Sequence, residues 1–155
     1  MSVAGRCAWV TGGGEALGKA IALELAARGA KVVVSGPDER ALGLVVGEIA
    51  YGGGKTRHAV VAPDDARATE AALAKLRDVF GAPSILVLGE GDETRAAAHV
   101  LATALEGPDA VVVSAAALPG ELRAALAARG VAHRTISVDR DPEIVARELA
   151  VALAA

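Results

Sequence analysis

Short Val-rich runs alternate along this chain with longer segments in which apolar residues recur every three or four positions. Runs that are apolar throughout are typical of strands buried on both faces, and the longer period is typical of helices that cover such strands. The pattern predicts strands over residues 6–11, 31–35, 57–61, 84–88, 109–114 and 133–138. It predicts helices over residues 16–28, 38–51, 65–80, 93–106, 119–129 and 142–154.

The residues at the expected helix ends agree with this division. Asp38, Asp65 and Asp141 stand where N-caps are expected, and Pro142 suits a first helical position. Five glycines suit the left-handed residue after a helix: Gly29, Gly52, Gly81, Gly107 and Gly130. Six strand–helix repeats predict an α/β fold, a three-layer Rossmann-type doubly wound sheet of about six parallel strands.

Composition narrows the possible partners. A chain of 155 residues without an internal boundary predicts a single domain over 1–155. The aromatic content is 2% and the net charge is −3 without a basic run, which argues against nucleic acid as a partner. No stretch approaches the roughly 20 apolar residues of a membrane span, and Cys7 is the one cysteine, expected to be buried. We therefore expect a cytoplasmic protein without disulfides, metal or membrane contact.

A glycine-rich loop over residues 11–18 joins the first strand to the first helix. Glycines permit a tight turn there, and backbone N–H groups at a helix N-terminus can meet a pyrophosphate. The candidate cofactor-binding residues are Thr11, Gly12, Gly14, Ala16, Leu17 and Gly18. The alternative is a tight turn whose glycines serve only close helix packing.

The loop resembles that of the short-chain dehydrogenase/reductase family, which reads Thr-Gly, three residues, Gly, an aliphatic residue and Gly. Gly12, Leu17 and Gly18 are in place, whereas Ala16 replaces the middle glycine. The resemblance runs through residues 1–91 as a half with a degenerate cofactor loop, and residues 92–155 resemble a shortened second half. It implies an NAD(P) site at the carboxyl ends of the strands.

Residues that would recognise the cofactor differ from the family pattern. After the second strand the family has an acid or an arginine for the ribose, where this chain has Ser35, Gly36 and Pro37. The family's adenine-contacting Asp aligns with Ala62, and its Asn-Asn-Ala-Gly segment aligns with residues 88–91. The resemblance therefore predicts either no cofactor or weakly bound NAD(P).

The family's catalytic pair, a Tyr followed four residues later by a Lys, is absent. Tyr51 is the one tyrosine, and it is predicted at the end of the second helix, remote from the site. All lysines precede the fourth strand: Lys19, Lys31, Lys55 and Lys75. Ser114 ends the fifth strand near the place of the family's serine, and Ala127 stands roughly where the tyrosine is expected. No catalytic residue is predicted.

Other motifs have simpler explanations. Residues 13–19 have P-loop spacing, but Ala20 lacks the hydroxyl that would bind magnesium. The glycine run 52–54 also resembles a phosphate loop, but it leads into a strand and not into a helix whose N–H groups could hold a phosphate. The three histidines, His58, His99 and His133, belong to different elements. The acid pairs 64–65 and 92–93 are expected to begin helices, where negative charge is favourable. Glu90 is expected beside the crevice, where it can block the nicotinamide position.

These observations favour a catalytically incompetent subunit with a structural role in an oligomer, homomeric or with a family member. The resemblance implies association through the helices around 96–105 and 122–128, beside an active NAD(P)-dependent dehydrogenase such as one acting on hydroxyacyl or oxoacyl thioesters. The alternatives are a stand-alone nucleotide-binding module without turnover, an enzyme with unrelated chemistry in the same crevice, and an engineered or truncated domain.

Overall fold

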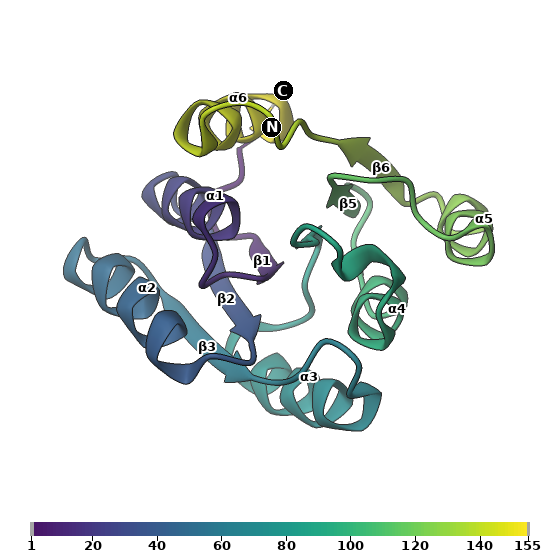
Figure 1. Cartoon of the computed structure of the whole chain (residues 1–155), viewed down its shortest axis with the longest axis horizontal. Coiled ribbons are helices and arrows are strands. Elements are labelled where there is room, and N and C mark those ends of the chain that lie inside the picture. The colour runs from purple at the N-terminus through teal and green to yellow at the C-terminus, as the bar shows by residue number, and fades with distance from the viewer. Residues whose placement is uncertain (1, 155) are drawn as a thin grey trace.

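The computed structural model describes residues 2–154 and contains six strands and six α-helices in strict alternation (Figure 1). The strands are β1 (Cys7–Thr11), β2 (Lys31–Gly36), β3 (Thr56–Val60), β4 (Ile85–Val87), β5 (Val111–Ser114) and β6 (Ala132–Thr135). The helices are α1 (Ala16–Ala27), α2 (Glu39–Tyr51), α3 (Ala66–Phe80), α4 (Ala96–Thr103), α5 (Gly120–Ala128) and α6 (Pro142–Ala154). A 3-10 turn, η1 (Asp92–Thr94), precedes α4.

All six strands form one parallel sheet in the order β3-β2-β1-β4-β5-β6. The order reverses between β1 and β4, where Ala8 pairs with Ile85 and Val10 pairs with Val87. The fold is therefore the predicted doubly wound Rossmann type, and its ligand crevice is expected at the carboxyl ends of β1 and β4.

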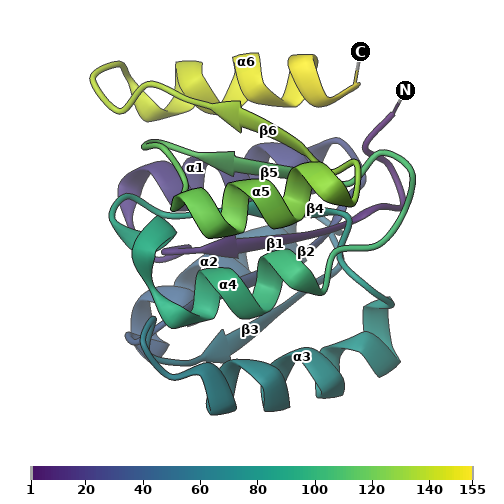
Figure 2. The ribbon, with the colours of Figure 1, turned by 90° about the vertical axis from the view of Figure 1, so that its right-hand side faces the viewer.

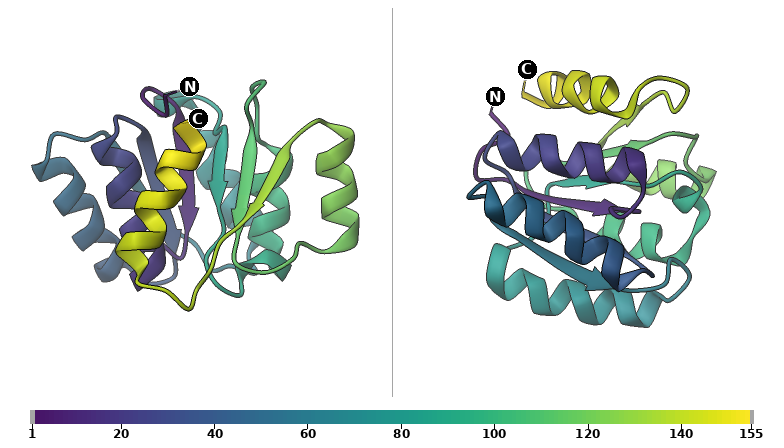
Figure 3. Two further views of the ribbon diagram at one scale, coloured as in Figure 1. Left: turned by 90° about the horizontal axis from the view of Figure 1, so that it is seen from above. Right: turned by 60° about the vertical axis from the view of Figure 1, so that its left-hand side comes forward.

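Helices cover both faces of the sheet, as the side views show (Figures 2 and 3). The core on one face joins alternate strand residues to α1, α2 and α6, with Ile21, Leu25 and Leu149 among its members. The core on the other face joins the remaining strand residues to α3, α4 and α5, and it contains Trp9 and Leu101. Strands β1, β2, β4 and β5 are buried almost throughout, which explains their unbroken apolar sequences.

The predicted N-cap aspartates are confirmed, and so are the predicted left-handed glycines except Gly52. Asp38 accepts a hydrogen bond from the N–H of Ala41, and Asp65 accepts one from the N–H of Ala68. Asp141 accepts one from the N–H of Glu143. Four of the five predicted glycines have positive φ, but Gly52 has φ −79° and Gly53 takes the left-handed conformation at φ +86°.

Two predicted elements differ in the structure. The helix expected over 93–106 is divided, because η1 occupies 92–94 and α4 begins only at Ala96. The strand expected over 133–138 is shorter, and β6 is an exposed sheet edge that pairs only with β5. Within residues 2–154 no helix has both the length and the hydrophobicity that a membrane span requires.

Candidate functional site

The glycine loop makes a tight turn directly after β1. Gly12 has φ +64°, a conformation that favours glycine, and a Cβ on Gly18 would collide with the Gly12 carbonyl oxygen. A Cβ on Gly13 would lie 2.6 Å from Cβ of Val34, and one on Gly14 would lie 2.8 Å from Cβ of Ala41. Packing against β2 and α2 therefore requires these glycines whether or not a ligand is bound.

A polar contact joins the loop to the segment after β4. The hydroxyl of Thr11 donates to Oδ2 of Asp92 at 2.8 Å and accepts from the N–H of Gly89 at 2.8 Å. Burial raises the pKa of the Asp92 carboxyl, the hydrogen bond from Thr11 opposes that shift, and nearby Glu93 adds to it. Asp92 and Glu93 begin the 3-10 turn η1, as expected of this acid pair, but no side chain caps the turn, and Oδ2 of Asp92 accepts from Thr11 instead.

Two small cavities lie at the carboxyl ends of the strands. The cavity between α1 and β4, of about 190 Å³, includes Ala16, Leu88, Glu90 and Arg140 in its lining. The cavity between β2 and α4, of about 110 Å³, includes Thr11, Asp92 and Pro37 in its lining. Glu15 is the one residue that lines both. A larger hollow of about 750 Å³ lies away from this crevice, between α1 and α6.

Few side chains on the β2 side are free to recognise a ribose. Ser35 is buried, and its hydroxyl accepts a hydrogen bond of 3.0 Å from Nε1 of Trp9. Gly36 has no side chain. Pro37 has an apolar side chain and no backbone N–H to donate. Ala62 follows β3 as an exposed methyl group.

The sequence model of the short chain dehydrogenase family matches residues 6–117, more than half of the chain. The chain belongs to this family. No curated protein has a sequence that matches it.

Solved structures of family members share the fold at low sequence identity. A metagenomic short-chain oxidoreductase in complex with NADP has 20% identity and a TM-score of 0.79, and covers 99% of this chain and 92% of its own. A short-chain type dehydrogenase/reductase from Mycobacterium marinum has 18% identity and a TM-score of 0.81, covering 99% and 89%. A hydroxysteroid dehydrogenase from Escherichia coli has 19% identity and a TM-score of 0.80, covering 99% and 91%.

The residues of this family member fit the family's dinucleotide poorly. The hydroxyl of Ser35 is engaged by Trp9, and Pro37 supplies no hydrogen-bond donor beside it. The two cavities, of about 190 and 110 Å³, lie below the roughly 300–1,000 Å³ of ordinary ligand pockets, and Glu15 stands between them. The turn is retained, but the groups that would hold a dinucleotide across it are not.

The side chains discussed for catalysis do not meet at the crevice. Tyr51 lies at the end of α2 with 96% of its surface exposed. Ser114 is 0% exposed, and its hydroxyl donates to the Ala116 carbonyl at 2.6 Å and contacts Nε2 of His133 at 2.7 Å. Burial lowers the pKa of His133, as does the charge of Arg123. Ser114 itself has no exposed surface, whereas His133 is half-buried in the edge strand β6, so the hydroxyl is reached only past its contacts with Ala116 and His133.

The remaining candidates are placed as expected. His58 lies in β3, His99 in α4 and His133 in β6, and no group of metal-ligating side chains occurs in the part of the chain that the structure describes. Cys7 is buried, and burial raises its pKa to about 11, so its thiol is inert at neutral pH. Glu90 is exposed and lines the cavity beside β4, as predicted.

Proposed function

We propose that this short-chain dehydrogenase homologue is a non-catalytic subunit with a structural role in an oligomeric complex. The complex is either a homo-oligomer or an assembly with an active NAD(P)-dependent family member, such as one acting on hydroxyacyl or oxoacyl thioesters.

The lining of the crevice supports this proposal most directly. The residues that line the cavity between α1 and β4 include no tyrosine, lysine, histidine, cysteine, serine or threonine. Hydride transfer to a carbonyl needs a proton donor positioned at the carbonyl oxygen, and a tyrosine paired with lysine provides it in the family. Glu15, Glu90 and Arg140 are the ionisable residues there, and Arg140 is held by Glu148.

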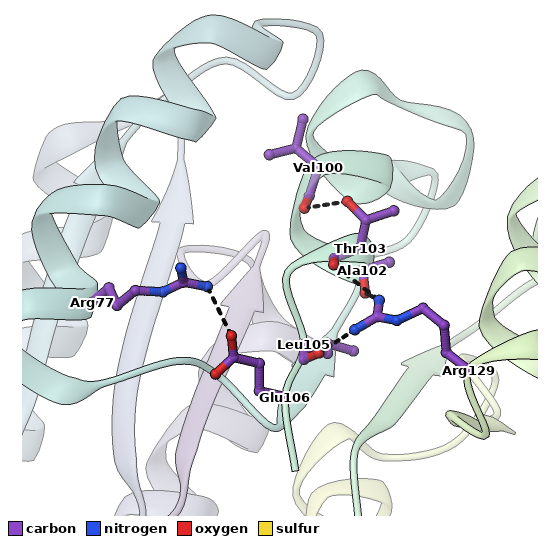
Figure 4. Close-up of polar contacts among 7 residues, drawn as sticks. All are labelled: Arg77, Val100, Ala102, Thr103, Leu105, Glu106 and Arg129. Carbon is purple, nitrogen blue, oxygen red and sulfur yellow. Dashed lines mark hydrogen bonds and ion pairs between the residues drawn. The ribbon is translucent and has the colours of Figure 1, made fainter.

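Arg129, at the end of α5, links this helix to the end of α4 (Figure 4). The guanidinium of Arg129 donates to the carbonyls of Thr103 at 2.9 Å and of Leu105, which satisfies the C-terminal end of α4. On the other side of that end, Arg77 of α3 forms an ion pair with Glu106 at 3.6 Å. Small exposed residues on α5 permit close approach of another helix, in keeping with the association surface that the sequence suggested.

The outer face of α6 is a second surface suited to association. Ile144 and Val151 are 42% and 58% exposed, and Arg147 and Glu148 lie between them on the same side of the helix. The order Ile-Arg-Glu-Val is self-complementary: in an antiparallel pair of two α6 helices, each Ile144 meets Val151 of the other copy, and each Arg147 approaches the Glu148 carboxylate that Arg140 of that copy already contacts. A second copy of this chain is therefore the occupant that this face fits best.

Light scattering on the purified chain tests this association. The wild type is expected to be a dimer, and the variant Ile144→Arg/Val151→Arg is expected to be a monomer. Leu44→Arg is the matched control, because Leu44 is 64% exposed on α2 and is expected to leave the dimer intact. A wild-type chain that is monomeric alone and also monomeric when isolated from its source would contradict the proposal.

A stand-alone nucleotide-binding module is the second candidate. The retained turn at Gly12 and Gly18 favours it, and one of the similar solved structures is described as a complex with NADP. A nucleotide-binding module must bind phosphate at this loop. Phosphate binding can be measured separately from the oligomeric state.

A further inference from the structure

The cations around the glycine loop are already paired with acids. Lys19 on α1 forms an ion pair with Glu48 at 3.1 Å, and Arg95 after η1 forms one with Asp64 at 2.8 Å. Arg140, which lines the cavity beside β4, contacts both carboxylate oxygens of Glu148, at 2.6 and 2.8 Å. No basic side chain among the cavity-lining residues is left to meet a phosphate.

The acids at the same place lack ion-pair partners of their own within residues 2–154, although the charge of Arg95 lowers the pKa of Asp92 against the effect of its burial. These acids are Glu15, Glu90 and Asp92, which line the two cavities. Two of them converge on the loop: from the position of a Cβ on Gly12, Oε2 of Glu15 is 3.3 Å away and Oδ2 of Asp92 is 3.7 Å away.

The position of Glu15 is decisive. It is the N-cap residue of α1, so its carboxylate stands at the positive end of the helix dipole, where a bound phosphate would gain its main attraction. A phosphate brought to the turn must displace this carboxylate or share the place with it. Either step is unfavourable, because like charges repel: Glu15 and Glu90 act from exposed positions, and the half-buried Asp92 carboxyl beside them is less screened by water.

We infer that Glu15, Asp92 and Glu90 make the glycine loop of this chain reject phosphate, so that NAD(P) is excluded by charge although the turn that binds it is retained. The inference goes beyond the proposed subunit role and does not depend on it, because a subunit of either oligomeric state can hold or reject a nucleotide.

Titration with NADH tests the inference, and Trp9 provides the signal. Trp9 is the one tryptophan and lies in β1 two residues before Thr11, so NADH bound at the loop accepts its excitation energy and quenches its fluorescence. The variant Glu15→Gln/Glu90→Gln/Asp92→Asn removes the three charges and keeps hydrogen-bonding groups of similar size. It is expected to bind NADH about tenfold or more tightly than the wild type.

Two controls separate charge at the loop from other effects. Glu121→Gln on α5 changes the net charge far from the loop and is expected to leave NADH affinity unchanged. For the unaltered chain, raising the salt concentration is expected to strengthen NADH binding, because salt screens repulsion. NADH affinity that falls with salt, or a triple variant that is folded by circular dichroism and binds no better than the wild type, would overturn the inference. Light scattering measures the oligomeric state and the titration measures NADH binding. Failure of the titration therefore leaves the proposed subunit role untouched, and the reverse also holds.

Discussion

The turn after β1 and the crevice beside it differ in what determines their residues. Packing contacts determine the glycines of the turn, whereas no such contact within residues 2–154 determines the acids that line the crevice. In the turn, Gly13, Gly14 and Gly18 are fixed by contacts with Val34, Ala41 and the Gly12 carbonyl. In the crevice, acids such as Glu15 and Glu90 line the cavity beside β4, whose lining includes no tyrosine or lysine.

The difference teaches that a family's glycine loop can persist for reasons of packing alone. The glycines are needed for α1 and α2 to lie close to β1 and β2, and this requirement holds whether or not a ligand is bound. A glycine signature therefore predicts the fold more securely than it predicts the cofactor. The side chains around the loop decide the chemistry.

The largest effect is expected from Gly18→Val, which tests whether packing fixes the turn. The added carbons would enter the space of the Gly12 carbonyl, so we expect a loss of about 3 kcal/mol or more in the free energy of unfolding. Gly43→Ala on α2 is the control: a Cβ there meets nothing within 4 Å, and a gain of about 0.5–1 kcal/mol is expected. Urea denaturation measures both, and equal effects of the two substitutions would refute the packing argument.

Arg129→Met tests whether Arg129 stabilises the end of α4 by linking it to α5. The substitution keeps much of the side-chain volume but removes the donors that meet the last carbonyls of α4, so we expect a loss of about 2 kcal/mol. Hydrogen exchange should locate the loss at the end of α4. Lys75→Met on α3 is the control, expected to change stability by less than about 0.5 kcal/mol. Unchanged exchange in α4 would show that Arg129 does not stabilise this end of the helix.

Asp92→Asn tests, through the pH dependence of stability, whether burial in the crevice raises the pKa of the Asp92 carboxyl. A carboxyl whose pKa is raised by folding binds its proton more tightly in the folded state, so its contribution to stability falls as pH rises from 3.8 through the folded pKa. Asparagine does not titrate and can still accept from Thr11. The variant is therefore expected to have the higher melting temperature at pH 7, with a smaller advantage below pH 3.8. Asp65→Asn, which keeps its cap, serves as control; an advantage that grows on acidification would contradict this reasoning.

The smallest effect is expected from Tyr51→Phe. The side chain is 96% exposed at the end of α2, so its hydroxyl contributes neither to packing nor to the crevice. We expect the free energy of unfolding to change by less than about 0.5 kcal/mol, measured by urea denaturation. A large destabilisation would show that the Tyr51 hydroxyl does contribute to packing.

Much of the fold could be predicted from the sequence because the elements carry strong local signals. The Val-rich runs at β1, β2, β4 and β5 are buried on both faces, and Asp38 and Asp65 cap helices as expected. β6 was harder, because an edge strand is partly exposed and its sequence extends into the apolar loop at Ile136 and Val138.

The side-chain contacts of the site could be predicted only in part. The local pattern at Asp92, which follows Gly91, predicts the start of a helix, and Asp92 does begin η1. Its contact with Thr11 depends on β1 and β4 being neighbours, a long-range fact that only the doubly wound order supplies. The pairing of Trp9 with Ser35 and the self-complementary face of α6 likewise depend on tertiary placement.

Native mass spectrometry of the chain purified from its source, with and without NADH and NADPH, tests the central claim most directly, because it reads association and nucleotide together. The account predicts an assembly, either of two copies or with another family member, in which this chain carries no nucleotide. A single chain that retains one bound nucleotide would contradict the account.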